Sequence, residues 1–322
     1  MTPVEAVRSV NSTAYGYIPA WALLTACGER LFDRLPATVD ELCDTYPDTD
    51  LTETWLRVLE RDQLVAEMDG RWSTTDAMTP LLVGDDSYAD YLGGQVLDGL
   101  APRLMGGPGG ANVLADVLHD PGRRTGYDGW FADAEEARAY QESQFAGSLG
   151  PARAISKLVP EPQGRILDLG GGWGAIARAL ADRHAVDVDV VDLAPVVAAA
   201  PPAGDRVTFL EGSALDPETW PAEVEYDGVV LSYLLSSVPG ATHEPLLAAL
   251  ADRGVRWIAI HDFMTDRGEL AAAWSLQHAV FVPGHRSFTS EQVADHLTSY
   301  GFASLAVNPI VDQMTAMVTA VR

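Results

Sequence analysis

The stretch RILDLGGGWGAIARAL, residues 165–180, decides how the rest of the sequence is interpreted. A short apolar run ends at Leu169, three consecutive glycines follow, and Gly174 precedes a helical pattern. Glycine allows positive φ and lets a ligand lie against the backbone at the N-terminus of the following helix. The stretch therefore predicts a β-strand, a ligand-binding turn and a helix.

Two acids beside this turn indicate the kind of ligand. The glycines lack the spacing of G-x-G-x-x-G, and no Gly-Lys-Ser/Thr follows for a triphosphate. Asp168 would repel a phosphate and attract a positive group. A second apolar run, VDVDVVDL, carries Asp192 at its end, where an acid can accept hydrogen bonds from ribose hydroxyls. A ribose and a cationic centre in one ligand describe S-adenosylmethionine; the alternative is a plain tight turn with two surface acids.

The charge and composition of the chain exclude some classes of binding partner. The 322-residue chain has a net charge of −25 at pH 7, and Lys157 is its only lysine. Such a surface repels phosphate backbones and anionic lipid heads, so neither nucleic acid nor a membrane is an expected partner. Cys27 and Cys43 match no metal or redox spacing, and MTPVEAVRSV lacks the regions of a signal peptide. We expect a cytoplasmic protein of about two domains.

The first eighty residues have a helical pattern that ends in a hairpin. Apolar residues recur at helical spacing over 14–35, Thr38 and Glu41 form a capping-box pattern, and Asp69-Gly70 sits between two alternating runs. Three helices followed by a hairpin form a winged-helix pattern. Because the chain is acidic, we expect this part to build a dimer or cover a pocket rather than bind DNA.

From Arg165 onward, the β-rich runs RILDL, VDVDVVDL, DGVVLSYL and RWIAIHDF alternate with helix-length segments. This alternation predicts an α/β domain with a parallel, doubly wound sheet. The expected organisation is a winged-helix-like domain over 1–95, linking helices that form a pocket wall over 96–155, and a catalytic domain over 156–322.

Several stretches together resemble one enzyme family. ILDLGGGWGAIARAL and VDVVDLAPVV are similar to the first two motifs of class I S-adenosylmethionine-dependent methyltransferases. With ARAYQESQFAGSLGPARAI and HRSFTSEQVADHLTSYGF, the chain resembles the small-molecule O-methyltransferases, which include plant caffeate-type and bacterial natural-product enzymes. The resemblance implies a Rossmann-like catalytic domain, an N-terminal winged-helix dimerisation domain and a homodimer.

The resemblance also implies a set of cofactor-binding residues. The turn residues would hold the methionine end and the end of the second strand would hold the ribose. The loop EGSALD, residues 211–216, would flank the adenine, although the family usually has Gly-Asp where this chain has Gly212-Ser213. The residues that would bind S-adenosylmethionine are Asp168, Gly170, Gly172, Gly174, Asp192, Leu193, Ser213 and Ala214.

The family's general base is absent from this chain. Its His-Asp pair after the fourth strand corresponds here to Ser236 and Ser237, and a neutral hydroxyl cannot replace imidazole as a base. The base could instead be His278, His261 or Tyr233. Alternatively, the acceptor is an amine or an enol-like carbon that needs no strong base. As a third possibility, the scaffold binds the cofactor but runs decarboxylation, hydroxylation or a pericyclic reaction. The histidines lack the close spacing of a metal site, so we expect no metal.

Aromatic side chains favour a flat or aromatic acceptor. The expected substrate-binding residues are Tyr15, Tyr17, Trp130, Phe131, Tyr140, Gln144, Trp274 and Phe281. The sequence as a whole therefore predicts a methyltransferase that acts on a small organic molecule, with oxygen as the default acceptor atom and nitrogen or carbon as alternatives.

Overall fold

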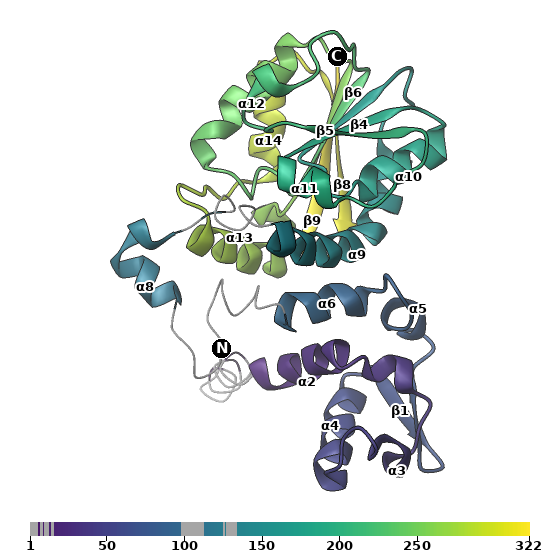
Figure 1. Ribbon diagram of the computed structural model, residues 1–322. Coiled ribbons are helices and arrows are strands. Elements are labelled where there is room, and N and C mark those ends of the chain that lie inside the picture. Colours follow the sequence, from purple (N-terminus) through teal and green to yellow (C-terminus); the bar gives the residue numbers. More distant parts are fainter. Residues whose placement is uncertain are drawn as a thin grey trace. The chain divides into compact units, whose positions relative to one another are not determined.

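The structure, a computed structural model, describes residues 16–97, 113–124, 126 and 134–322, together with residues 6, 9 and 13. The chain divides into two compact units, Met1–Leu100 and Ala101–Arg322 (Figure 1). The predicted division at residues 95 and 155, and the role given to each part, stay predictions.

The first unit contains short helices and a two-stranded hairpin. Its elements are α2 (Tyr17–Gly28), η1 (Leu31–Arg34), α3 (Val39–Leu42), α4 (Thr49–Arg61), β1 (Val65–Met68), β2 (Arg71–Thr74), α5 (Thr79–Leu82) and α6 (Tyr88–Leu97). The capping box is present, because the Thr38 hydroxyl accepts from the Glu41 N–H and the Glu41 carboxylate accepts from the Thr38 N–H. The hairpin turns at Asp69 and Gly70, as predicted.

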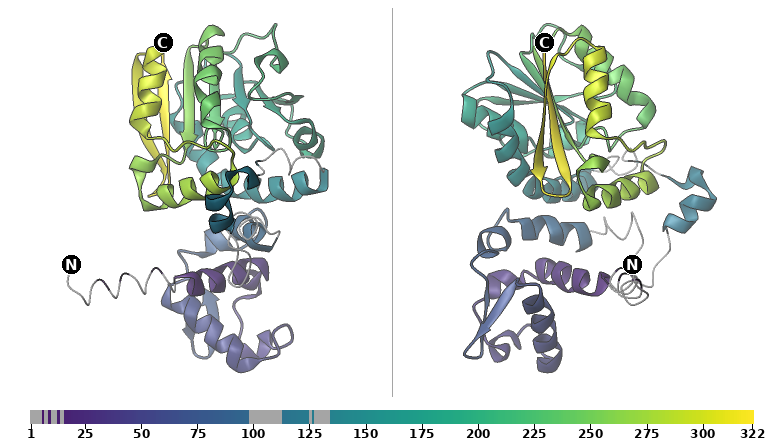
Figure 2. Two further views of the ribbon diagram at one scale, coloured as in Figure 1. Left: turned by 90° about the vertical axis from the view of Figure 1, so that its left-hand side faces the viewer. Right: turned by 180° about the vertical axis from the view of Figure 1, so that it is seen from behind.

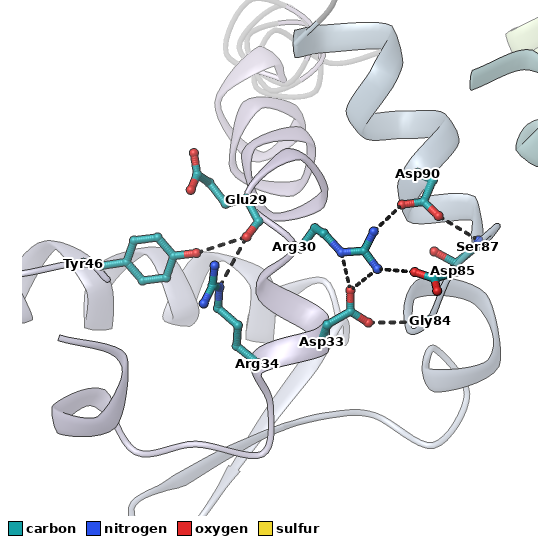
Figure 3. A network of polar contacts seen from close by, with 9 residues as sticks. All are labelled: Glu29, Arg30, Asp33, Arg34, Tyr46, Gly84, Asp85, Ser87 and Asp90. Atoms are coloured by element: carbon teal, nitrogen blue, oxygen red, sulfur yellow. Dashed lines mark hydrogen bonds and ion pairs between the residues drawn. The ribbon is translucent and has the colours of Figure 1, made fainter. Parts of the chain in front are cut away.

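The helical spacing over 14–35 does not give one continuous helix. Arg30 adopts a left-handed conformation with φ of 53°, which separates α2 from η1. Its guanidinium donates to Asp33 at 2.9 Å, to Asp85 at 3.1 Å and to Asp90 at 3.2 Å (Figure 3). Asp33 in turn accepts from the Gly84 N–H at 2.8 Å. One cation therefore fixes the segment between α5 and α6 to the chain that follows α2.

The second unit is built on a seven-stranded sheet with strand order β5-β4-β3-β6-β7-β9-β8. Strands β3 to β7 are parallel, whereas β9 runs antiparallel to both β7 and β8. The strands are β3 (Ile166–Leu169), β4 (Val188–Asp192), β5 (Val207–Glu211), β6 (Gly228–Ser232), β7 (Trp257–Asp262), β8 (Ser304–Val311) and β9 (Thr315–Val321). The doubly wound sheet is thus confirmed, and the antiparallel pair β8–β9 is an addition that the sequence pattern did not predict.

Helices cover both faces of this sheet (Figure 2). The helices are α8 (Val113–His119), η2 (Pro121–Arg123), α9 (Ala134–Leu158), α10 (Ala175–His184), α11 (Ala194–Ala199), η3 (Pro217–Thr219), η4 (Gly240–Thr242), α12 (His243–Asp252), η5 (Thr265–Arg267), α13 (Glu269–Phe281) and α14 (Ser290–Ser299). Alternate strand residues enter two cores. Leu167 and Leu169 pack with residues of α12 and α14, whereas Ile166 packs with residues of α9 and α10.

In the part of the chain that the structure describes, no helix combines the length and the apolar character needed to cross a membrane.

Candidate active site

A cavity of about 460 Å³ opens at the carboxyl ends of the parallel strands. Its described lining comes from the residues that follow β3, β4, β5 and β6, from one face of α9, and from Gly126, Val282 and Pro283. Because the sheet order reverses at β3, between β4 and β6, the loops after these strands diverge and leave a crevice. The cavity therefore occupies the position where doubly wound sheets bind ligands.

The glycine turn after β3 presents bare backbone to this cavity. Gly170 and Gly172 line it and have φ values of +70° and +57°. A Cβ at Gly172 would lie only 2.5 Å from Oε1 of Gln141, so that amide group would have to move. Gly174 also has positive φ but lies outside the described lining, where it is the N-cap residue of α10 and lies close to the Phe209 ring. The turn thus favours glycine at Gly172 because of its backbone conformation.

Asp192 at the end of β4 joins the turn to the next strand. Its Oδ2 accepts from the Gly172 N–H and its Oδ1 accepts from the Leu193 N–H, both at 2.7 Å. Burial raises the pKa of this carboxyl to about 6, and the two N–H donors limit the rise. Each carboxylate oxygen has further lone pairs, so Asp192, which lines the cavity, can accept additional hydrogen bonds from a ligand.

The loop after β5 forms the next part of the wall. Ser213 and Ala214 line the cavity, as does Leu193. The Ser213 N–H donates to the Thr219 hydroxyl at 2.9 Å, and the Trp220 indole N–H donates to the Ser213 carbonyl at 2.8 Å. The predicted adenine-side loop is therefore held in place by its own chain.

Asp168 lies beneath the turn rather than in the cavity wall. It is fully buried, and a Cβ at Gly171 would lie 2.6 Å from its carboxyl group. Neither of its oxygens has a hydrogen-bond partner among the described residues. Burial raises the pKa of Asp168 to about 7, and the nearby Ala177 backbone N–H offsets part of this rise without meeting hydrogen-bond geometry. Its predicted role toward the cofactor stays a prediction.

Tyr233, directly after β6, lines the cavity. Its φ of 56° is unusual for a non-glycine residue, and its N–H donates to the His261 carbonyl at 2.8 Å. Its ring packs against His261 at 4.5 Å and against Phe263 at 4.9 Å between centroids. A strained backbone at a cavity is typical of a residue that is held for function.

Side chains of neighbouring strands hold the His261 ring in place. It is fully buried, Nδ1 lies 2.9 Å from the Ser232 hydroxyl, and Nε2 lies 2.9 Å from the Thr315 hydroxyl. Burial lowers its pKa to about 3, so the ring is neutral at pH 7. It is outside the described cavity lining. The ring therefore joins β6, β7 and β9, and this geometry does not favour a role as the base.

His278 on α13 is also outside the described lining. Its Nδ1 lies 2.8 Å from the Trp274 carbonyl, and a carbonyl only accepts, so Nδ1 carries the proton and Nε2 carries the lone pair. Burial lowers the pKa of His278 to about 4. The Phe263 ring lies 5.4 Å from His278 and 4.9 Å from Tyr233 between centroids. One aromatic ring therefore separates this neutral imidazole from a cavity residue.

The two serines at the position of the family's base are engaged by the protein. Ser236 is buried, and its N–H donates to Oδ2 of Asp262 at 3.0 Å. Ser237 lines the cavity, and its hydroxyl donates to the Tyr233 carbonyl at 2.6 Å. Burial raises the pKa of Asp262 to about 6, and Asp262 also accepts from the Phe263 N–H at 2.8 Å. The Ser236 hydroxyl also interacts with the Asp262 carboxyl and limits the rise of its pKa, and neither serine hydroxyl has a histidine as its hydrogen-bond partner among the described contacts.

Of the eight predicted substrate-binding residues, two belong to the described lining of the cavity. Tyr140 and Gln144 line the cavity from α9. Trp274 stacks on Phe263 at 5.0 Å and Phe281 is buried, and both lie outside the described lining. Tyr17 is about half exposed in the first unit. The other three, Tyr15, Trp130 and Phe131, lie outside the described residues.

The cavity lining also includes Gln141, which the sequence did not assign to a site, and Trp173, whose place in the glycine turn predicts that it shields the cofactor. Gln141, on the same face of α9 as Tyr140 and Gln144, is 6 % exposed, and Trp173 within the glycine turn is 7 % exposed. A glutamine on a helix gives no sequence signal of its own. A large aromatic residue among four glycines is a signal, because a turn of that kind leaves little room for a side chain.

A family model described as "Methyltransferase domain" matches residues 138–307, which is more than half of the chain. The chain belongs to the methyltransferase domain family. Comparison with curated proteins gives no match. The predicted family and enzyme class are confirmed by the family model.

Solved methyltransferases share the fold over the whole chain. Human N-acetylserotonin methyltransferase in complex with SAM is 19 % identical with a TM-score of 0.80, covering 100 % of this chain and 99 % of that one. An O-methyltransferase family protein from Burkholderia thailandensis is 19 % identical with a TM-score of 0.75, covering 100 % and 98 %. CalO1, a methyltransferase in calicheamicin biosynthesis in its SAH-bound form, is 21 % identical with a TM-score of 0.76, covering 100 % and 99 %. These similarities confirm the Rossmann-like α/β fold.

Proposed function

We propose that this methyltransferase transfers a methyl group from S-adenosylmethionine to a small organic acceptor. The observation that carries the proposal is the single cavity that joins the glycine turn, Asp192 and the Ser213 loop at adjacent strand ends. Asp192 would accept hydrogen bonds from the ribose, the Gly170–Gly172 backbone would face the methionine end, and Ser213 and Ala214 would flank the adenine. Two structures of similar fold hold SAM or SAH, which supports this cofactor.

The chemistry of the lining fits this cofactor. No lysine, arginine or histidine is among the lining residues that the structure describes, whereas Asp192 lines the cavity and Asp168 lies beneath the turn. Negative groups without a competing cation favour a positively charged ligand. When bound, the cofactor would supply an electron-poor methyl group, and the protein would have to align the acceptor and exclude water.

Oxygen is the acceptor atom that we propose first, with nitrogen and carbon beside it. His278 carries a free lone pair on Nε2, but a pKa of about 4 makes it a weak base. An acceptor that loses no proton before attack, such as a neutral amine, would therefore suit the site without a strong base. Tyr233, Tyr140 and Gln144 line the cavity and would position the acceptor.

A second candidate function is non-methylating chemistry on the same scaffold. It is favoured by one observation, the buried Ser236 that stands where the family has its base and that is held by Asp262. An enzyme that no longer takes a proton from a hydroxyl acceptor could lose that base without penalty.

Calorimetric titration with S-adenosylmethionine and S-adenosylhomocysteine tests the cofactor proposal. We expect both to bind, and incubation with phenols, amines and α-keto acids should then give a product heavier by one methyl group. Binding of both without methylation of any acceptor would favour the second candidate. If neither ligand binds, the proposed function is wrong.

We also propose the homodimer that the resemblance implies. It is supported by α2, an apolar helix on which Tyr17 and Ile18 are exposed by 49 % and 52 %. Light scattering on the eluting protein should give twice the mass of one chain, and a monomer at micromolar concentration would contradict the dimer.

A further inference from the structure

A second cavity, of about 430 Å³, lies in the same unit as the seven-stranded sheet. Its lining comes from the chain after β6, from η4 and the start of α12, from the chain before α14, and from α14 itself. Among the residues that the structure describes, it shares no lining residue with the cavity at the glycine turn. A cavity of this size can enclose a small organic molecule, so it can hold a ligand of its own.

Part of the wall of this second cavity is apolar. Four buried side chains of the core beneath α12 and α14 belong to the lining, namely Leu235, Leu247, Phe288 and Val293. Apolar surface that leaves water on binding contributes favourably to affinity. The second cavity therefore favours a ligand with an apolar body.

Arg286 brings a cation without a partner to the second cavity. Among the cationic side chains that the structure describes, four form no hydrogen bond or ion pair, namely Arg153, Lys157, Arg183 and Arg286. Of these four, only Arg286 lines one of the two cavities. The chain carries a net charge of −25, so acids that could neutralise an arginine are abundant. An arginine that none of them engages can bind the anionic group of a ligand.

The fold fixes the point from which the Arg286 side chain starts. The Gly240 N–H donates to the Gly284 carbonyl at 2.9 Å. Next to Gly284, Nδ1 of His285 lies 3.1 Å from the Ser236 carbonyl. A Cβ at Gly240 would lie 2.5 Å from the Cβ of Arg286, so the two chain segments approach closely here. The guanidinium is therefore attached to a well-held segment at the cavity, which reduces the entropy lost when an anion binds.

The titratable groups around Arg286 determine which anion fits. His243 and His296 also line the second cavity. Burial lowers the pKa of His243, and the nearby His296 and Arg286 lower it further. Glu244 and Asp295 line the cavity as well, and neither forms an ion pair with Arg286. Two acids beside one guanidinium repel a doubly charged ligand more than a singly charged one. The cavity therefore suits a monocarboxylate better than a phosphate.

We propose that the second cavity binds a small monocarboxylate with an apolar body, whose carboxylate pairs with the Arg286 guanidinium. The body lies against the apolar part of the wall. Segments 233–240 and 282–288 each contribute residues to both cavities, so the bound carboxylate contacts the same stretches of chain that line the cavity at the glycine turn. The site is nevertheless separate, and its existence does not depend on the proposed function.

The test is an NMR titration of the full chain with three probes. 3-Phenylpropanoate has the proposed chemistry, 3-phenylpropanamide has nearly the same shape without the charge, and phenyl phosphate carries more negative charge. We expect 3-phenylpropanoate to bind in the millimolar range or better, at least about fivefold more tightly than either other probe. Arg286→Gln should raise the Kd for 3-phenylpropanoate at least about fivefold and that for the amide less than about twofold, because only the carboxylate uses the guanidinium.

A variant with an effect of the opposite sign sharpens the test. Glu244→Gln removes a repelling charge and should lower the Kd for 3-phenylpropanoate about twofold. Glu223→Gln is its control and Arg183→Gln is the control for Arg286→Gln, because each removes the same charge outside the lining of both cavities. All four positions are exposed, so the variants should fold.

Three results would overturn the proposed carboxylate site. The first is no binding of 3-phenylpropanoate at millimolar concentration. The second is equal binding of the carboxylate and the amide. The third is a loss of affinity in Arg286→Gln no larger than that in Arg183→Gln, which would mean that the carboxylate binds elsewhere. The titration contains no S-adenosylhomocysteine, so its result is distinct from a failure of the proposed function.

Discussion

Buried polar groups at the two ends of the cavity differ in whether they have hydrogen-bond partners. At the glycine turn, both carboxyl oxygens of Asp168 and the indole N–H of Trp173 are buried without hydrogen-bond partners among the described residues. Near β6 and β7, by contrast, His261 is held by two hydroxyls and Asp262 by two backbone N–H groups. The first end thus keeps buried polar groups without partners, whereas the titratable groups of the second end are held by hydrogen bonds within the fold.

This difference determines how much each end of the cavity indicates about its ligand. Unpaired groups indicate what a ligand must supply, so the cofactor can be argued from chemistry. Groups that already have partners leave no such demand, and the acceptor has to be found by experiment. Four substitutions test the contrast, from the largest expected effect to the smallest.

Asp192→Ala should raise the Kd for S-adenosylhomocysteine about 100-fold or more. The change removes acceptors for the ribose and also the partners of the Gly172 and Leu193 N–H groups. Two lost hydrogen bonds to a charged acceptor account for a change of this size. Calorimetry measures it, with the exposed Asp205→Ala as the matched control. Similar affinities in the two variants would show that the ligand does not use this carboxylate.

Asp168→Asn should remove a pH dependence of stability from the ligand-free protein. The folded-state pKa of about 7 is above the unfolded value, so this group's contribution is lost as pH rises from about 4 to 7. Relative to the parent, the variant should gain roughly 2 kcal/mol in free energy of unfolding between pH 5.5 and pH 8. Urea unfolding at the two pH values measures this gain. Asp205→Asn should show none, and an unchanged slope in Asp168→Asn would refute the unpaired state of the carboxyl.

Gly172→Ala tests whether the bare turn is needed for the ligand. The added Cβ would meet Oε1 of Gln141 at 2.5 Å, so this cavity-lining amide must shift, and affinity for S-adenosylhomocysteine should fall about tenfold. Gly254→Ala is the matched control, because Gly254 also has positive φ, +72°, but has nothing within 4 Å of the added carbon. Both variants should lose about 1 kcal/mol of stability from backbone strain, and only Gly172→Ala should lose affinity.

Ser236→Ala should have the smallest effect. The hydroxyl is buried, and its contact with the Tyr233 carbonyl is long, at 3.5 Å. We expect binding of S-adenosylhomocysteine, and turnover of any acceptor found by the methylation screen, to change less than about twofold. Loss of turnover with intact binding would mean that the second end does contain a catalytic hydroxyl, and the contrast between the two ends would no longer hold.

The glycine turn could be predicted because its requirements are local. Positive φ at Gly170 and Gly172 and an acid at the end of the next strand follow from how a chain leaves one parallel strand and enters a helix. These requirements place glycines and an acidic residue at a fixed spacing in the sequence. The structure brings six of the predicted cofactor residues to one cavity, and their role toward the cofactor stays a prediction: Gly170, Gly172, Asp192, Leu193, Ser213 and Ala214.

The surroundings of His261 and Gln141 depend on residues far away in the sequence. His261 ends a strand and could face a cleft, but it shares the face of β7 with Trp257 and Ala259, and its ring meets Thr315 from β9. Sequence alternation does not say which strand will pair beside it. Likewise, only the packing of α9 against the turn brings Gln141 to Gly172. Contacts of this kind follow from tertiary structure, and no local pattern encodes them.

The acidic residues at the cavity should also influence the rates at which ligands associate. S-adenosylmethionine carries a net charge of +1, whereas S-adenosylhomocysteine is neutral overall, and the chain itself carries −25. A field of this sign accelerates the diffusion of a cation to the cavity and has little effect on a neutral molecule. Added salt should therefore slow the association of the methyl donor while leaving that of its product nearly unchanged. The same carboxylates that suit the cofactor would in this way help fresh donor to replace spent product.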